Sequence, residues 1–148
     1  MKIANTVLMY APEGSSKALR MKPAILRVGA KIKIVTSDMF EEKIGTLVGL
    51  TEEEIAEIAA TAQLSDEEAG HQVTLTQEEM QELNNLSEEV LVMWNFENNK
   101  IDQLLQNFKK SGVARVNLKA VVTPNNIKWT FAQLVRELQK EHEAYQKI

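Results

Sequence analysis

Few side chains in this sequence are suited to catalysis or metal binding. The chain has two histidines, His71 and His142, and no cysteine, which excludes thiolate nucleophiles, disulfides and cysteine-ligated metals. Glu137 and Glu141 are spaced to share one face of a helix, but His142 lies about 100° away from Glu141. The helix dipole accounts for a histidine near a helix C-terminus. We therefore expect a non-enzymatic protein with no catalytic residue, no metal and no cofactor.

A loop near the N-terminus could bind an anion. The sequence APEGSSK at 11–17 places Ser15, Ser16 and Lys17 at the start of a predicted helix, where backbone N–H groups are unpaired. The loop lacks the G-x-x-x-x-G-K-[ST] spacing of a phosphate loop, and a helix cap explains it equally well. One hypothesis is a regulatory domain that binds a small anionic ligand or nucleotide at these three residues.

Two aromatic residues could stack on nucleic-acid bases. Tyr10 and Trp94 occupy equivalent places on two predicted strands, and basic residues lie on the strands beside them. The chain lacks the basic-glycine-aromatic signature of RNA-recognition sheets, and its acidic segment would repel phosphates. We expect both rings to pack in the core, and an RNA-binding module ranks third among the hypotheses.

Charge is divided unevenly along the chain. Residues 51–99 hold 13 acidic residues and no lysine or arginine, whereas the rest holds 17 basic and 8 acidic residues, giving −13 against +9. The acidic stretch contains three T/S-x-x-E capping boxes, which mark helix N-termini and begin at Thr51, Ser65 and Thr76. We predict an acidic helical insertion over 51–88.

Two copies of a β-α-β pattern flank this insertion. The apolar runs TVLMYA and VLVMW predict buried strands, and each is followed by a helical pattern and an alternating strand. A displacement of 83 residues brings Val7 onto Val90 and superposes the glycines that end the two helices. The inner strands are predicted at 6–11 and 89–94, and the edge strands, with outward lysine and arginine, at 31–37 and 114–122.

The fold class predicted from this order is α+β. We expect a ferredoxin-like β-α-β-β-α-β sandwich that forms one domain over 1–148, with the acidic insertion and an added C-terminal helix. The alternative is an α/β doubly wound sheet, since continuous apolar strands suit that fold equally well.

A Thr-Pro pair predicts where the last helix begins. Thr123 is a good N-cap, and Pro124 at the first helical position loses no hydrogen bond. On a helix that begins there, Ile127 starts the apolar face and Trp129 lies about 200° from it. Trp129 therefore needs a different cover from the rest of its helix.

The position of Trp129 away from the apolar face of its helix gives the leading hypothesis for function. A tryptophan beside Arg136 and Lys140 is typical of an interface. We expect a small protein-interaction or self-associating module that binds a protein partner or a second copy through Trp129, Arg136 and Lys140. Anion binding is the alternative, and binding of nucleic acid is not expected.

The N-terminus does not predict export. Asn5 and Thr6 interrupt its apolar run, Glu13 follows, and no small-residue cleavage site is present. No window approaches about 18 uncharged apolar residues, so we expect no membrane span and a cytoplasmic location.

Most of the chain outside the acidic segment resembles a known family, most specifically at its C-terminal end. The stretch LKAVVTPNNIKW and the later ELQKEHEAY are similar to the signature of an uncharacterised family of short bacterial proteins, described only as a domain of unknown function. The blocks VLMY, Ile44-Gly45, Gly49, LVM and Gly112 are similar to its earlier parts. The resemblance implies no activity or ligand, but it draws attention to a set of motif residues: Lys119, Thr123, Pro124, Asn126, Trp129, Glu141 and His142.

Overall fold

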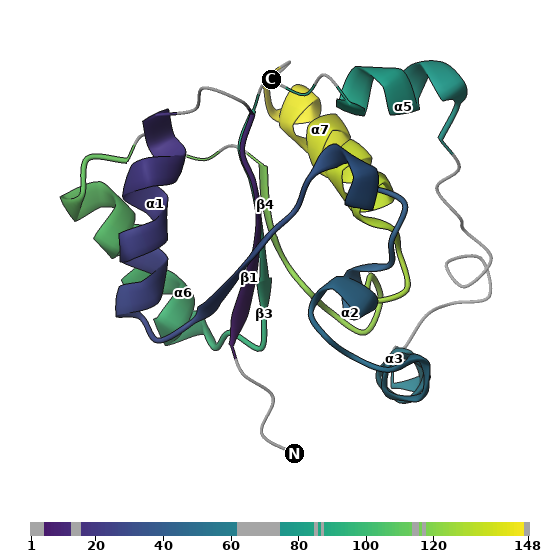
Figure 1. Cartoon of the computed structure of the whole chain (residues 1–148), viewed down its shortest axis with the longest axis horizontal. Coiled ribbons are helices and arrows are strands. Elements are labelled where there is room, and N and C mark those ends of the chain that lie inside the picture. Colours follow the sequence, from purple (N-terminus) through teal and green to yellow (C-terminus); the bar gives the residue numbers. More distant parts are fainter. Residues whose placement is uncertain are drawn as a thin grey trace. The chain divides into compact units, whose positions relative to one another are not determined.

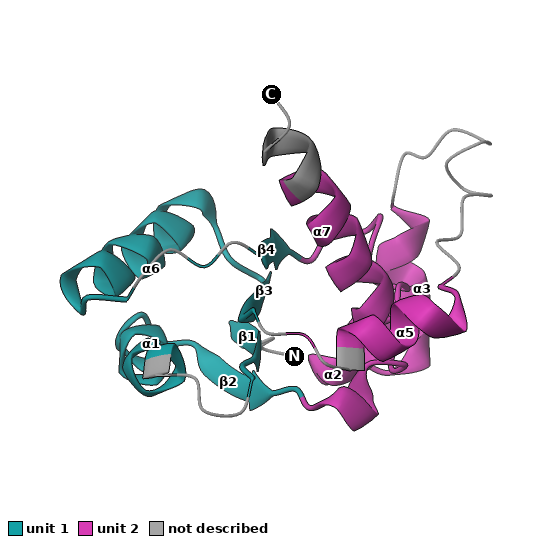
Figure 2. Ribbon diagram, turned by 90° about the horizontal axis from the view of Figure 1, so that it is seen from above, with its two compact units in different colours: residues 1–35, 87–121 teal, residues 36–86, 122–148 magenta. Residues whose placement is uncertain are grey.

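The computed structural model divides into two compact units (Figure 2). Unit 1 comprises residues 1–35 and 87–121, and unit 2 comprises residues 36–86 and 122–148. The structure describes residues 5–12, 16–61, 75–84, 86, 88–113, 116 and 118–146.

Unit 1 contains a four-stranded mixed sheet with the order β2-β1-β3-β4 (Figure 1). Its strands are β1 (Thr6–Tyr10), β2 (Lys31–Ile34), β3 (Val90–Trp94) and β4 (Leu118–Val121). Every residue of β1 and β3 is buried, which confirms the prediction that the two apolar runs form the inner strands. The edge strands are shorter than predicted.

The observed strand order differs from the predicted ferredoxin-like topology. In that fold each β-α-β unit is split, with another strand inserted between its two strands. Here β1 pairs directly and in parallel with β2, β3 pairs in parallel with β4, and β1 and β3 are antiparallel. The antiparallel centre also differs from the doubly wound alternative. Both strand orders place apolar strands inside and amphipathic strands outside, so residue pattern alone does not separate them.

Two helices cover one face of this sheet. They are α1 (Ser16–Arg27) and α6 (Asn98–Lys110), which lie side by side in Figure 2. Gly29 and Gly112 follow them with φ of 80° and 75°, as predicted for helix ends. The N-cap of α6 is Glu97. The core between helices and sheet is formed by Val7, Met9, Met21, Ala24, Ile25, Ala30, Leu91, Met93, Phe96, Leu104, Phe108, Val113 and Val116.

Unit 2 is helical. Its elements are η1 (Ser37–Met39), α2 (Ile44–Leu47), α3 (Glu52–Ala60), α5 (Gln77–Asn84) and α7 (Phe131–Gln146). The capping boxes predicted at Thr51 and Thr76 are both present, and the one at Ser65 lies outside the described residues. No element was predicted between the edge strand at 31–37 and the insertion at 51–88, although this part of the chain contains most of η1 and all of α2. None of the described helices is long and apolar enough to cross a membrane.

Candidate functional site

The segment that carries the C-terminal motif is a turn, not the start of a helix. Residues 124–128 form turns, and α7 begins at Phe131. Thr123 and Asn126 hold the turn reciprocally: the Thr123 N–H donates to Asn126 Oδ1 at 2.8 Å, and the Asn126 N–H donates to Thr123 Oγ1 at 3.3 Å. A second reciprocal pair, Thr130 and Gln133, caps α7. The predicted helix start at Pro124 is therefore wrong by seven residues.

The segment before α2 and the turn before α7 exchange backbone hydrogen bonds that cap the starts of the two helices. The N–H groups of Ile44 and Gly45 donate to the carbonyls of Trp129 and Ile127 at 2.9 and 3.1 Å. In return, the Phe131 N–H donates to the Glu42 carbonyl at 3.0 Å, and the Ala132 N–H donates to the Phe40 carbonyl at 2.9 Å. The first N–H groups of a helix have no partner within it, so each segment satisfies donors that the other helix leaves unpaired.

This geometry changes the interpretation of Trp129. Its position about 200° from Ile127 assumed that both residues lie on one helix, but both precede α7. The Trp129 carbonyl accepts a hydrogen bond from α2, its own N–H donates to the Asn126 carbonyl at 3.0 Å, and its side chain is half-buried. A structural role of the backbone therefore accounts for much of the motif around Trp129.

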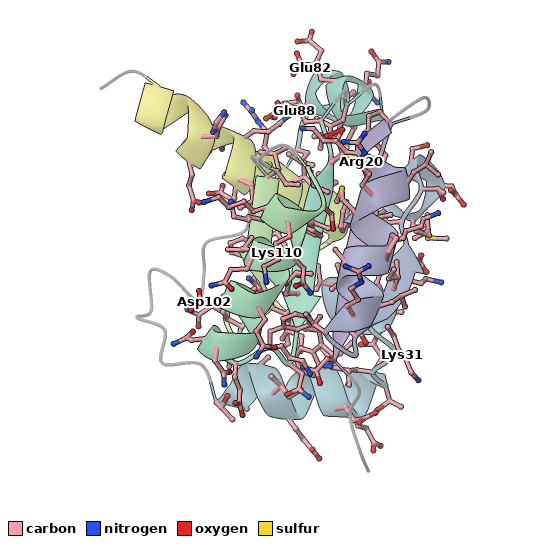
Figure 3. All side chains as sticks on the ribbon, turned by 90° about the vertical axis from the view of Figure 1, so that its left-hand side faces the viewer. Arg20, Lys31, Glu82, Glu88, Asp102 and Lys110 are labelled. Atoms are coloured by element: carbon pink, nitrogen blue, oxygen red, sulfur yellow. The ribbon has the colours of Figure 1, made fainter. Side chains whose placement is uncertain are left out.

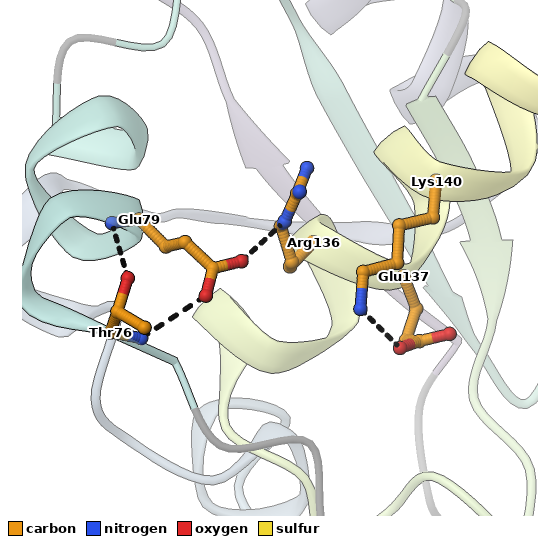
Figure 4. Close-up of polar contacts among 5 residues, drawn as sticks. All are labelled: Thr76, Glu79, Arg136, Glu137 and Lys140. Carbon is orange, nitrogen blue, oxygen red and sulfur yellow. Dashed lines mark hydrogen bonds and ion pairs between the residues drawn. The ribbon is translucent and has the colours of Figure 1, made fainter.

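Both basic residues of the predicted Trp129 surface have carboxylate partners (Figure 4). Arg136 Nε lies 2.7 Å from Glu79 Oε2 on α5, and Lys140 Nζ lies 3.7 Å from Glu137 Oε1 on its own helix. Glu79 also accepts the Thr76 N–H at 3.2 Å. The backbone hydrogen bond from Thr76, and then the bond from Arg136, lower the pKa of Glu79 below its ordinary value of 4.5. The Arg136 side chain thus joins α7 to α5 within unit 2.

The lowered pKa of Glu79 predicts an acid-sensitive contribution to stability. Since the folded-state pKa is below the unfolded value, the stabilisation is fully present above pH 4.5 and is lost as the pH falls through the lower folded-state value. We expect Glu79→Gln to destabilise the protein at neutral pH, with a difference from wild type that shrinks below pH 4.5. Urea unfolding across this pH range measures it, and Glu78→Gln controls for the loss of one charge on α5. A difference independent of pH would contradict the prediction.

The other predicted site residues do not converge on a ligand site. Lys17 Nζ lies 3.1 Å from Glu89 Oε1, so the cation of the predicted anion site is paired with a carboxylate. Ser15 lies outside the described residues, and so does the side chain of Ser16. Lys119 Nζ donates to the Val116 carbonyl at 3.1 Å.

The candidate metal ligands are not clustered. Glu141 is exposed and His142 half-buried on α7. Within the part of the chain that the structure describes, no three His, Asp or Glu side chains are grouped as metal ligands would be. His71 lies outside that part.

The two aromatic residues considered for base stacking are buried. Tyr10 and Trp94 are 8% and 9% exposed, and because β1 and β3 are antiparallel they lie at opposite ends of the pair, opposite Val90 and Thr6. Burial raises the pKa of the Tyr10 phenol above 10.0. Trp94 Nε1 has no hydrogen-bond partner among the described residues. Packing therefore describes both rings better than base stacking does.

A feature that the sequence analysis missed is an exposed apolar stripe on α1. Leu19 and Leu26 are 76% and 61% exposed, and Pro23 between them is also exposed. At 100° per residue, Pro23 and Leu26 fall within about 40° of Leu19. The core residues Met21 and Ile25 fall on the opposite side of the helix. A helical wheel drawn from the sequence at 100° per residue would have separated the two apolar faces of α1.

Comparison with known proteins finds one family. No curated protein and no solved structure matches the chain significantly. The family match covers less than half of the chain, and it begins after the sequence blocks at Val7 and Ile44 that also resemble a family. Residues 89–145, from the residue before β3 to the last turn of α7, match the family described as a domain of unknown function (DUF3783), which confirms the resemblance over this part of the chain.

Proposed function

We propose that this protein is a non-enzymatic protein-interaction module that binds an acidic helical surface through α1. The observation that carries the proposal is the exposure of Leu19 and Leu26 on the side of α1 that faces away from its core. An apolar stripe at positions i, i+4 and i+7 is the pattern with which helices dock against partners. Isolated exposed leucines are common on proteins, but these two lie on one helix face with the exposed Pro23 between them.

The charges around the stripe specify the chemistry of the partner. Residues 14–37 contain six basic residues and no acidic residue, and Figure 3 shows Arg20 on α1 and Lys31 on β2. Lys22 and Arg27, both exposed, flank Leu19 at about 60° and 80° on either side of the stripe. A positive surface of this kind raises the association rate of a negative partner and disfavours a positive one.

The size of the stripe sets the expected strength of binding. Full burial of a leucine contributes about 1.5–3 kcal/mol, so the two leucines supply roughly 3–6 kcal/mol. This is comparable with the cost of about 4 kcal/mol or more for bringing two molecules together. Charge attraction must therefore add to the apolar contact, and the affinity should be modest and fall as salt increases.

Binding to a designed peptide tests the proposal. The probe is an amphipathic helical peptide with alanine and leucine on one face and glutamate elsewhere, and titration calorimetry at low ionic strength is the measurement. We expect wild type to bind and Leu19→Ser/Leu26→Ser to bind at least about tenfold more weakly. Both leucines are exposed, so the double variant should keep its stability within about 0.5 kcal/mol per substitution.

Matched controls separate the stripe from general charge. Leu105→Ser removes an exposed leucine from α6 and should bind the peptide as wild type does. A peptide with lysine in place of glutamate should not bind. Equal binding by wild type and the α1 double variant would overturn the proposal. Binding to anionic vesicles without binding to the acidic peptide would also overturn it, because the surface would then be a membrane-contact surface.

A further inference from the structure

We infer that the occupant of the α1 stripe is α3 of a second copy of this chain. The inference rests on the proposed function of α1 as a docking helix and adds the identity of its partner. The acidic segment 51–99 and the basic segment 14–37 give every copy both a negative and a positive surface. The described helix of the acidic segment that best complements α1 is α3, at Glu52–Ala60.

The exposed face of α3 matches α1 in side-chain size. Ala56 and Ala60 are both exposed and lie four residues apart, so they are stacked on one side of the helix. Ile55 is buried in unit 2 and lies about 100° from Ala56 and about 140° from Ala60 on the α3 wheel. A face of alanines lets another helix approach closely, and the exposed Leu19 and Leu26 of α1 are the large side chains that would fill the space above it.

The charges on the two helices are also complementary. Glu53 and Glu57 are exposed and lie within about 100° of Ala56 on the α3 wheel. Lys22 and Arg27 border the leucine stripe of α1 on its two sides, whereas Glu53 and Glu57 lie on one side of the alanines. An antiparallel or parallel approach of the two faces therefore brings leucine onto alanine and places glutamate beside lysine or arginine.

The other described acidic helix fits less well. In α5, Glu79 is bound to Arg136 of its own chain and to the Thr76 N–H, and although Glu78 and Glu82 are exposed, the helix has no alanine for the leucines of α1 to pack on. In α3, Glu52 is paired with Lys43 at 3.1 Å, but Glu53 and Glu57 are on the exposed side. The comparison favours α3 as the surface that meets α1.

Charge reversal in trans tests the inference. One variant carries Lys22→Glu/Arg27→Glu on α1, and the other carries Glu53→Lys/Glu57→Lys on α3. Sedimentation velocity at several concentrations and low ionic strength measures association, and circular dichroism checks folding. We expect wild type to self-associate and each variant alone to do so at least about tenfold more weakly. The equimolar mixture should associate again, because each reversed helix then meets an opposite charge.

Two control variants keep the net charge of the test variants but change other helices. Lys109→Glu/Lys110→Glu on α6 matches the α1 variant, and Glu78→Lys/Glu82→Lys on α5 matches the α3 variant. Both should associate as wild type does. Loss of association in the α5 control, with none in the α3 variant, would overturn the assignment to α3.

The outcomes also separate this inference from the proposed function. A wild type that stays monomeric at every concentration overturns the inference. If that monomer still binds the acidic peptide through Leu19 and Leu26, α1 remains a docking helix whose partner is another protein. If peptide binding fails as well, the proposed function falls with it. A mixture of the two variants that stays monomeric would also count against the α1–α3 contact.

Discussion

Phe131→Ala is expected to lower the free energy of unfolding by about 3–5 kcal/mol. Phe131 is fully buried at the start of α7, and its ring stacks on Phe40 with centroids 5.4 Å apart and planes 28° apart. Truncation removes this aromatic contact and leaves a cavity, and neighbouring side chains fill such cavities only in part. The backbone N–H of residue 131 can still donate to the Glu42 carbonyl, so the loss reports the side chain.

Urea unfolding of Phe131→Ala measures this effect. Phe131→Leu, which keeps most of the apolar volume, serves as the control and should lose less. A loss below about 1 kcal/mol for the alanine variant would contradict a close-packed ring pair. It would mean that Phe40 and Phe131 contribute little to unit 2.

Gly45→Ala is expected to destabilise unit 2 by about 1–3 kcal/mol, because it overpacks the core. A Cβ at position 45 would lie 2.5 Å from Ile55 Cγ1 and 3.2 Å from Ile127 Cγ1. Gly45 is inside α2 and has no positive φ, so alanine would gain up to about 1 kcal/mol of helix propensity. The steric clash should exceed that gain, because Ile55 is buried and β-branched and has few other rotamers.

The free energy of unfolding of Gly45→Ala, compared with that of Thr46→Ala, checks this balance. Thr46 is exposed on the same helix, so its replacement gains helix propensity without the clash. We expect Thr46→Ala to be neutral or stabilising. If Gly45→Ala is also stabilising, α2 does not pack as closely on Ile55 and Ile127 as the distances indicate.

The features predicted correctly from the sequence are those set by local chemistry. Runs of apolar residues identified both inner strands, and T-x-x-E spacing identified the N-termini of α3 and α5. Gly29 and Gly112 marked helix ends because a positive φ there favours glycine. Each of these signals depends on residues a few positions apart.

The strand order could not be predicted in the same way. Inner and edge strands differ in their residue pattern, but the choice between a split and an adjacent β-α-β unit depends on which strand each crossover helix reaches. Nothing in the residues of α1 or α6 specifies this. The reciprocal caps between the start of α2 and the turn before α7 are also beyond local reasoning, since they join the segments at 42–45 and 127–131.

The position of Trp129 was misjudged although a signal for the true helix start was present. The prediction chose Thr123-Pro124 as the start, whereas Thr130-x-x-Gln133 fits the capping box and is the pair that caps α7. Because the helix was predicted to start too early, Trp129 was assigned to the surface of the helix, whereas it lies in the turn before α7. An interaction through Trp129 stays a prediction, with Arg136 held by Glu79.

The leucines of α1 were missed for a related reason. Ala18 and Leu19 are neighbours in the sequence, as are Ile25 and Leu26, so the sequence pattern alone groups each pair together. On a helix the members of a pair lie about 100° apart. Ala18 and Ile25 pack against the core, whereas Leu19 and Leu26 are exposed.

The most direct test of α1 as the docking helix is a heteronuclear NMR titration with the acidic peptide. Amide shifts should concentrate in residues 19–27 of α1 and in the neighbouring strand β2, and they should diminish as salt is added. Shifts centred on Trp129 and α7, or none at peptide concentrations well above those of the protein, would contradict the assignment of α1 as the binding surface.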